Sequence, residues 1–247
     1  MSTHKERHDQ HPHGNDVNPR TKSFDFWIRI KGPQAFWGGT TTGPCRSTSL
    51  FPSHGACRGI MRSILGPWEM MWVVSQVWIL KMPHLMTVTT NDIKSFNTAM
   101  YPGTMIPKPV DVNAQRTQRT LRVLRDVDYA FLAHLELTHH ALEADTICKY
   151  ELMAERRLDK QQRWRHLCLG TSENSRIDLQ RVDPSTLPTP VDLTEDYGLQ
   201  YFDEEYPSDS IKKQYFAELK VEKGILLFPS WEQVRQLGIA RTVVRPS

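Results

Sequence analysis

The sequence has few cysteines and no C-x-x-C pair. Cys45, Cys57, Cys148 and Cys168 lie far apart, which excludes the common zinc-knuckle and thioredoxin-like spacings. Their spacing favours free, mostly buried thiols in a reducing compartment over a disulfide framework.

No hydrophobic run is long enough to cross a membrane comfortably. The most apolar stretch, Pro67 to Met82, holds sixteen residues. As a helix it would reach about 24 Å, short of a hydrocarbon core of about 30 Å. Pro67 suits a first helical turn and Pro83 ends the run. We therefore expect a short helix that is either buried or lies at a membrane interface through three tryptophans: Trp68, Trp72 and Trp78. A membrane span is the least favoured alternative.

Neither charge sign dominates. A formal charge of +3 excludes binding to nucleic acid through the charge of the whole surface and leaves only local patches for it. Nucleic acid is therefore not an expected partner. Hydrophobic and charged fractions of 39% and 24% are those of an ordinary globular chain.

The first twenty residues are nearly free of apolar side chains. They lack the apolar core of a secretory signal, and their acidic residues oppose a transit peptide, so organelle import would need an internal signal. Such a segment predicts a solvated tail. Weak metal binding by its histidines is the alternative: His4, His8, His11 and His13.

Glycine and proline are absent from Val110 to Leu169, although the chain holds 13 Gly and 16 Pro. This absence predicts one long helix or a helical hairpin over residues 112–168. A helical projection gives two opposed apolar faces, so neighbouring elements should cover both. We expect a mainly α fold with small β elements, extended arms and a small α/β piece at the C-terminus.

Four arginines recur at every third position near the start of this segment: Arg116, Arg119, Arg122 and Arg125. Cations at a helix N-terminus oppose the helix dipole. They predict contact with an anion, either an acidic partner or the chain's own acidic stretch at 195–205; a solvated face is the alternative.

The ELTHHALE stretch holds the one candidate for metal chemistry. On a helix, its acidic and imidazole side chains project within about 100° of one another: Glu136, His139, His140 and Glu143. E-x-x-H is the spacing of di-iron bundles, but the sequence contains no second copy. No metal, cofactor or catalytic site is therefore expected. A helical metal-dependent enzyme using Glu136, His139 and Glu143 is an alternative.

Local signals define the remaining segments. Phe24 to Ile30 alternates apolar and polar residues and predicts a strand. The GGTTTG run at 38–43 lacks the GK[ST] ending of a phosphate loop. We expect an extended arm after Gly170 and a helix over 209–223. A second helix begins at a capping box of Ser230 and Gln233 and ends at Gly238, before an edge strand over 239–244.

These segments divide the chain into six regions. They are a polar tail, a strand and loop, the apolar helix, the long helical segment, an extended arm and a docking module: 1–23, 24–59, 60–109, 110–169, 170–207 and 208–247.

A helix too long for its own chain to cover is typical of a subunit that packs against neighbours. We therefore expect a non-catalytic accessory subunit of a large assembly, with other protein subunits as partners. The tryptophan-rich run favours a respiratory-type complex at the mitochondrial inner membrane, with peripheral lipid contact. Alternatives are a cytoplasmic protein and a subunit of a ribosomal particle.

Overall fold

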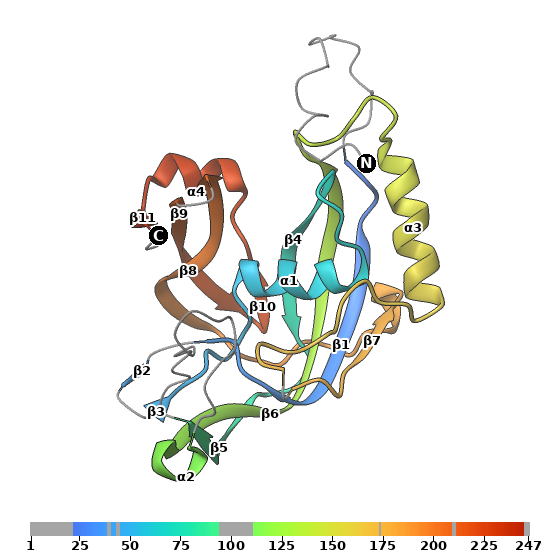
Figure 1. Cartoon of the computed structure of the whole chain (residues 1–247). Helices are drawn as coiled ribbons and strands as arrows, with labels where there is room; N and C mark the ends of the chain where they lie inside the picture. Colours follow the sequence, from blue (N-terminus) through green and yellow to red (C-terminus); the bar gives the residue numbers. More distant parts are fainter. Residues whose placement is uncertain are drawn as a thin grey trace.

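The computed structural model describes residues 22–38, 41–42, 45–93, 111–172, 174–208 and 211–244. In these ranges the chain builds one sheet of eleven strands, antiparallel in all but one pairing, with four short α-helices (Figure 1). The expected mainly α fold is therefore wrong. The first twenty residues with their histidines, and half of the GGTTTG run (Gly39, Thr40 and Gly43), lie outside the described residues.

Four strands form the centre of the sheet, in the order β4-β6-β1-β7. Each is antiparallel to its neighbour. Phe26 of β1 lies opposite Ala133 of β6, and Trp72 of β4 lies opposite Leu135. The predicted strand at 24–30 is confirmed, since β1 begins at Phe26. The bounds are β1 Phe26–Ala35, β4 Met70–Ile79, β6 Arg116–Leu137 and β7 Asp178–Arg181.

The predicted long helix is mostly strand β6. Every second residue of its second half is buried: Val127, Tyr129, Phe131, Ala133 and Leu135. This period of two is that of a half-buried strand, and freedom from glycine and proline suits a long strand as well as a helix. Only α2 (Val112–Gln115) and α3 (Ile147–Asp159) are helical within 111–169.

The predicted apolar helix is also a strand, β4, between the same two prolines. Trp72 and Val74 face the core before a bulge between Val74 and Gln76, and Val77 and Ile79 face it after the bulge. β-Branched and aromatic residues favour this pleated surface. No helix in the described part of the chain is long and apolar enough to span a membrane.

Two helices cover one face of the central strands. α1 (His54–Ile64) crosses β4, and α3 runs beside β6 and β7; both appear in front of and beside the sheet in Figure 1. Their buried side chains join those of the strands in one core. The four cysteines are free, as expected, but only Cys57 is buried, so the prediction of mostly buried thiols is wrong.

The C-terminal part extends the same sheet. β10 bridges β4 to β9, and β11 pairs with the same edge of β9 as β10, opposite β8. The helix expected over 209–223 is strand β9. The capping box and the edge strand are confirmed, and Gly238 ends α4 with φ of 67°. The bounds are β8 Glu195–Ser208, β9 Ile211–Glu222, β10 Ile225–Leu227, α4 Trp231–Leu237 and β11 Ala240–Val244, with a 3-10 turn at Pro184–Thr186.

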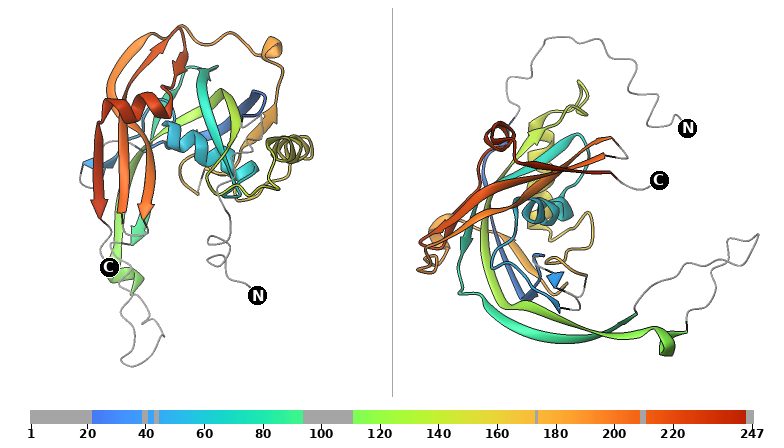
Figure 2. Two further views of the ribbon diagram at one scale, coloured as in Figure 1. Left: turned by 90° about the horizontal axis from the view of Figure 1, so that it is seen from above. Right: turned by 90° about the vertical axis from the view of Figure 1, so that its left-hand side faces the viewer.

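A long hairpin arm leaves the central sheet. It pairs β5 (His84–Ile93) with the first half of β6, and Figure 2 shows it reaching away from the rest of the molecule. The short strands β2 (Thr41–Thr42) and β3 (Cys45–Arg46) lie beside it, and β3 is parallel to β6.

Candidate nucleic-acid interface

Two cavities adjoin along Gln161 to Thr171, the segment that leads from α3 toward β7. The first, of about 530 Å³, lies between this segment, α1 and β8. The second, of about 660 Å³, is bounded by residues 161–167 and 175–177. His166 and Leu167 line both cavities. We call the two cavities together the groove.

Helix α1 carries two arginines, and one of them lines the groove. The helix begins where the Ser53 hydroxyl accepts a hydrogen bond from the Ala56 amide, at 3.2 Å. Arg58 and Arg62 are four residues apart and so share one side of the helix. Arg58 lines the first cavity.

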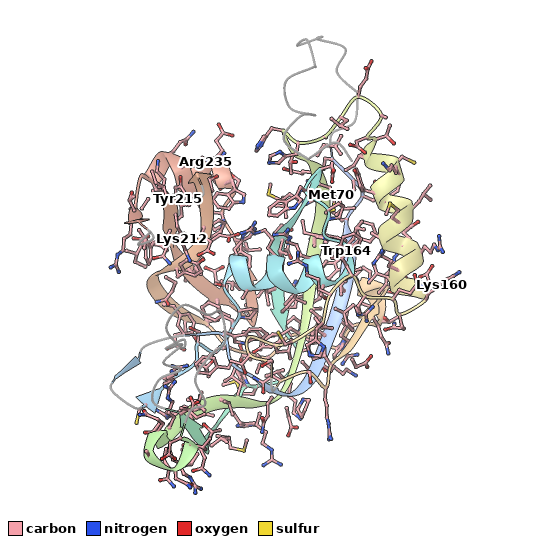
Figure 3. The ribbon with its side chains drawn as sticks, in the orientation of Figure 1. Met70, Lys160, Trp164, Lys212, Tyr215 and Arg235 are labelled. Atoms are coloured by element: carbon pink, nitrogen blue, oxygen red, sulfur yellow. The ribbon has the colours of Figure 1, made fainter. Side chains whose placement is uncertain are left out.

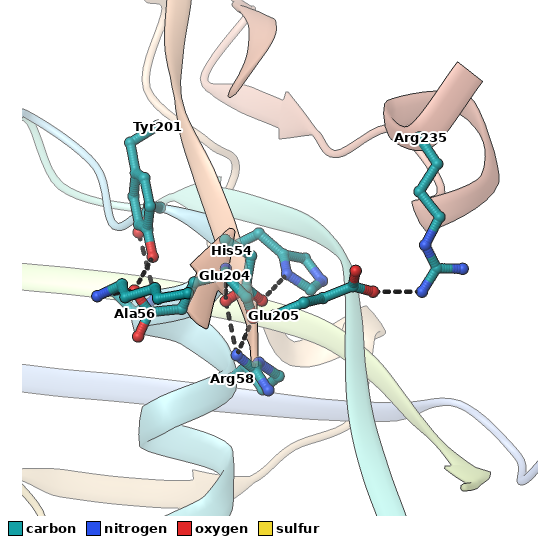
Figure 4. A network of polar contacts seen from close by, with 10 residues as sticks. His54, Ala56, Arg58, Tyr201, Glu204, Glu205 and Arg235 are labelled. Carbon is teal, nitrogen blue, oxygen red and sulfur yellow. Dashed lines mark hydrogen bonds and ion pairs between the residues drawn. The ribbon is translucent and has the colours of Figure 1, made fainter. Parts of the chain in front are cut away.

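A buried carboxylate holds Arg58 in place. Asp203 of β8 is fully buried and accepts hydrogen bonds from Arg58, at 2.6 Å, and from His54 Nδ1, at 2.8 Å. Figure 4 shows these side chains converging from α1 and β8. Burial raises the pKa of Asp203, but the two partners outweigh burial and hold it below its usual value. His54 stacks on Phe202 with ring centroids 4.4 Å apart, so this cluster fixes α1 against the C-terminal strands.

The positive charge at the groove exceeds what one carboxylate neutralises. Arg62 has a lowered pKa, first because of burial and then because of repulsion by Arg58 and Arg165. Arg62 thus lies close enough to both other guanidinium groups to be repelled by them. Arg165 and His166 are exposed. Such a cluster is relieved by an anion, and phosphate is the anion that guanidinium groups bind best.

The three tryptophans predicted at a membrane or partner lie in different environments. Trp68 is 60% exposed, in the turn before β4. Trp72 is fully buried and donates a hydrogen bond to the Leu65 carbonyl, at 2.9 Å. Trp78 packs against Trp27 on the opposite face of the sheet, with ring centroids 4.7 Å apart. Only Trp68 therefore presents a largely free surface, and an interfacial helix bearing all three does not exist.

The four predicted anion-binding arginines lie on the hairpin arm, along β6 instead of a helix. Arg116, Arg122 and Arg125 are exposed, and Arg119 pairs with Asp92 of β5 at 3.1 Å. A helix-dipole argument does not apply to them. Their contact with an anion stays a prediction.

The predicted metal candidates do not share a helix. Glu136 is the last residue but one of β6 and accepts a hydrogen bond from His134 Nε2, at 2.9 Å, which lowers the pKa of Glu136. His139 and His140 lie in the following turn, with ring centroids 3.9 Å apart, and Glu143 is exposed two residues beyond Ala141. Among the described residues, no three His, Cys, Asp or Glu side chains are arranged to hold a metal ion.

The sequence analysis does not predict the groove residues. The RWRH run from Arg163 to His166 interleaves cations with an aromatic residue, a pattern that suits nucleic acid. The predicted long helix includes this run at its end, so the run is not expected to form a binding site. Asp203 belongs to the acidic stretch expected to contact Arg116 to Arg125, but it pairs with Arg58, which is 145 residues away in sequence and carried no local signal.

Comparison with known proteins identifies the family. Residues 27–196, more than half of the chain, match the family model described as "CRISPR-associated protein (Cas_Cas5)". The chain belongs to this family. The matched range includes α1 and the whole segment from 161 to 171.

Relatives of this Cas5 family member carry a common name. One, from Mannheimia succiniciproducens, is 26% identical over 193 residues, which is 73% of this chain and 85% of the relative. Another, from Thermus thermophilus, is 32% identical over 122 residues, 49% of each chain. Both are named CRISPR pre-crRNA endoribonuclease Cas5d.

A solved structure shares the fold. The functionally uncharacterized protein SMU1763c from Streptococcus mutans aligns with a TM-score of 0.64 at 20% identity, covering 89% of this chain and 98% of that one.

These findings correct the functional expectations. A CRISPR-associated family with bacterial relatives overturns the respiratory subunit and the mitochondrial inner-membrane location. Relatives named as RNA-cleaving enzymes contradict a non-catalytic role and the view that nucleic acid is not a partner.

Proposed function

We propose that this protein binds the precursor of CRISPR RNA and cleaves it as an endoribonuclease. The observation that carries the proposal is the set of basic side chains that line the groove, Arg58, Arg165 and His166, all inside the family-matched range. The name shared by two relatives supports the choice of substrate.

The groove suits the RNA backbone. Arg58 of α1 lines the first cavity and Arg165 lines the second, so successive phosphates of a strand that runs through both cavities can each contact a guanidinium. Asp203 anchors Arg58 from the buried side. The near-neutral net charge of the chain does not oppose this reading, because a local patch is enough to bind phosphates.

RNA carries its own nucleophile, the 2′-hydroxyl. Cleavage needs a base to take the 2′-hydroxyl proton while the 2′-oxygen attacks the adjacent phosphorus. The bond from phosphorus to the 5′-oxygen then breaks, and the 5′-oxygen takes a proton from water. The products are a 2′,3′-cyclic phosphate and a 5′-hydroxyl.

His166 is the side chain placed for the base. It lines both cavities and is exposed to an incoming strand. It shares the second cavity with Arg165, so a phosphate held there by the arginine lies within reach of the imidazole. Imidazole is the most common general base in enzymes working near neutral pH. In this scheme the arginines stabilise the charge that develops on the phosphorane oxygens.

The test is cleavage of an end-labelled transcript of one CRISPR repeat with flanking sequence. We expect one cut, leaving a cyclic phosphate, and no cut when the attacking nucleotide is 2′-deoxy. His166→Ala should lower the single-turnover rate about 10²-fold to 10⁴-fold without weakening binding. His84→Ala, an exposed histidine of β5 outside the groove, is the matched control. An intact transcript in the presence of the wild-type protein, or wild-type cleavage by His166→Ala, contradicts the proposal.

A further inference from the structure

Two tryptophans with large exposed surfaces lie at the carboxyl end of α1. Trp68 is 60% exposed and Trp164 is 47% exposed; Figure 3 labels Trp164 beside the end of the helix. The Trp164 amide donates a hydrogen bond to the Ser63 carbonyl, at 2.5 Å. Gly66 lies between the two tryptophans, and a β-carbon there would come within 3.3 Å of Trp164 Cδ1. The two side chains therefore flank one helix end.

Each indole is paired with an arginine. The Arg62 guanidinium lies 4.8 Å from the ring centre of Trp68, and that of Arg157 lies 5.2 Å from the ring centre of Trp164. Arg157 also donates a hydrogen bond to the Ile64 carbonyl, at 3.2 Å, at the negative end of the α1 dipole. An arginine on one side of a ring leaves the opposite side free for another planar group.

The backbone beneath both rings is held firmly. The Trp68 carbonyl accepts a hydrogen bond from Thr138 Oγ1, at 2.6 Å, and Arg165 as well as Trp164 donates to the Ser63 carbonyl. Rings fixed in this way lose little conformational freedom when a ligand binds. An exposed indole leaves a large apolar surface in contact with water. A ligand that covers the two indoles at this helix end would therefore gain the favourable burial of both.

We infer that Trp68 and Trp164 form a stacking platform for unpaired bases of an RNA strand. The charge around the rings decides the class of occupant. Arg62, Arg157 and Arg165 surround the rings, and Trp164 lines the second cavity of the groove. Each nucleotide of a strand carries a phosphate close to its base, so a surface that alternates cations with aromatic rings complements a single strand. Bases in a duplex are stacked on one another and present no free face.

The inference rests on the proposed function for the identity of the strand. It places the cleaved strand in the first cavity and its unpaired flank on the two indoles. Base stacking tolerates any base, because each has a π face. The platform therefore gives affinity for an unpaired flank and no choice of sequence.

The test measures dissociation constants by fluorescence anisotropy with a labelled single-stranded 12-mer RNA and its abasic counterpart. Trp68→Ala and Trp164→Ala should each weaken binding of the intact strand about 5-fold to 150-fold. Trp164→Phe should retain most of the affinity. Leu152→Ala, which removes another exposed apolar side chain of similar exposure at 61%, is the matched control. Circular dichroism verifies the fold of each variant.

The abasic strand separates stacking from an indirect effect. If stacking is the cause, the alanine variants bind the abasic strand as the wild type does. An equal loss with both strands overturns the inference. Unchanged binding of the intact strand also overturns it and points to a protein partner for the two indoles.

The two proposals fail separately. If the tryptophan variants lose affinity but the wild type does not cleave the transcript, the proposed endoribonuclease activity is wrong and the stacking platform stands. Cleavage with normal binding by the tryptophan variants removes only the platform.

Discussion

Replacing Asp203 by asparagine tests the cluster that joins α1 to the C-terminal strands. The substitution keeps the shape of the side chain and removes its charge. Asp203 is fully buried, and it pairs with Arg58 and His54. After the change, Arg58 faces a neutral amide from a position where its side chain is only 22% exposed.

The magnitude follows from the burial of the pair. Removing one partner of a buried ion pair costs about 3–5 kcal/mol, because the remaining charge is left uncompensated. Since Arg58 keeps some contact with solvent, we expect the lower end, about 3 kcal/mol. In a chain of this size that lowers Tm by about 6–12 °C.

The same carboxylate predicts a pH dependence. Its pKa is lower in the folded protein than in the unfolded chain. The stabilisation it supplies is therefore complete above the unfolded value of about 4 and is lost as the pH falls through the folded value. The gap in unfolding free energy between wild type and Asp203→Asn should be constant near neutral pH and should narrow below about pH 4.

The assay is urea unfolding followed by circular dichroism, repeated between pH 7 and pH 3. Glu155→Gln is the control, because its pair with Arg181 is partly exposed and should contribute less than about 1 kcal/mol. A loss for Asp203→Asn as small as the control, or a gap that widens toward acid pH, refutes the argument that this buried pair stabilises the fold.

Two further changes probe the groove and its frame. Gly170→Ala should lower the free energy of unfolding by more than about 3 kcal/mol, because Gly170 has φ of 91° and an added β-carbon would lie 1.5 Å from the Phe36 carbonyl oxygen. The control Gly198→Ala should cost only about 1 kcal/mol, because Gly198 has φ of 60° but faces open space. Equal Tm shifts for the two variants contradict this account. Arg165→Gln should reduce the slope of log Kd for RNA against log salt by about 1, whereas Arg241→Gln on the exposed strand β11 should leave it unchanged; an unaltered slope for Arg165→Gln removes that residue from the phosphate contacts.

The C-terminal helix shows how far local sequence reaches. Ser230, Gln233 and Gly238 predicted its start and its end, and the structure has both. Each of these signals acts between residues three to five positions apart, through hydrogen bonds that the segment makes with itself. The first strand was likewise predictable from the alternation that begins at Phe26.

The central strand β6 shows where the sequence reading failed. Its odd-numbered residues from Val127 to Leu137 are all apolar, but the same residues also fit helical stripes. A helix satisfies its own hydrogen bonds, whereas β6 makes its bonds with β1, β4 and β5. The partners that decide between the two conformations lie as far as 107 residues away in sequence, as Phe26 and Ala133 do.

The candidate site was beyond local reasoning for the same cause. Arg58 and Asp203 form an ion pair because β8 and α1 pack together. Trp68 and Trp164 lie at the same end of α1 because the segment after α3 returns to that end. By itself the sequence determined the caps, the edge strand, the first strand and the proline limits of β4. Only the tertiary structure decided the sheet, the groove and the buried ion pair, because each is built from contacts between residues whose separation along the chain hides their proximity in space.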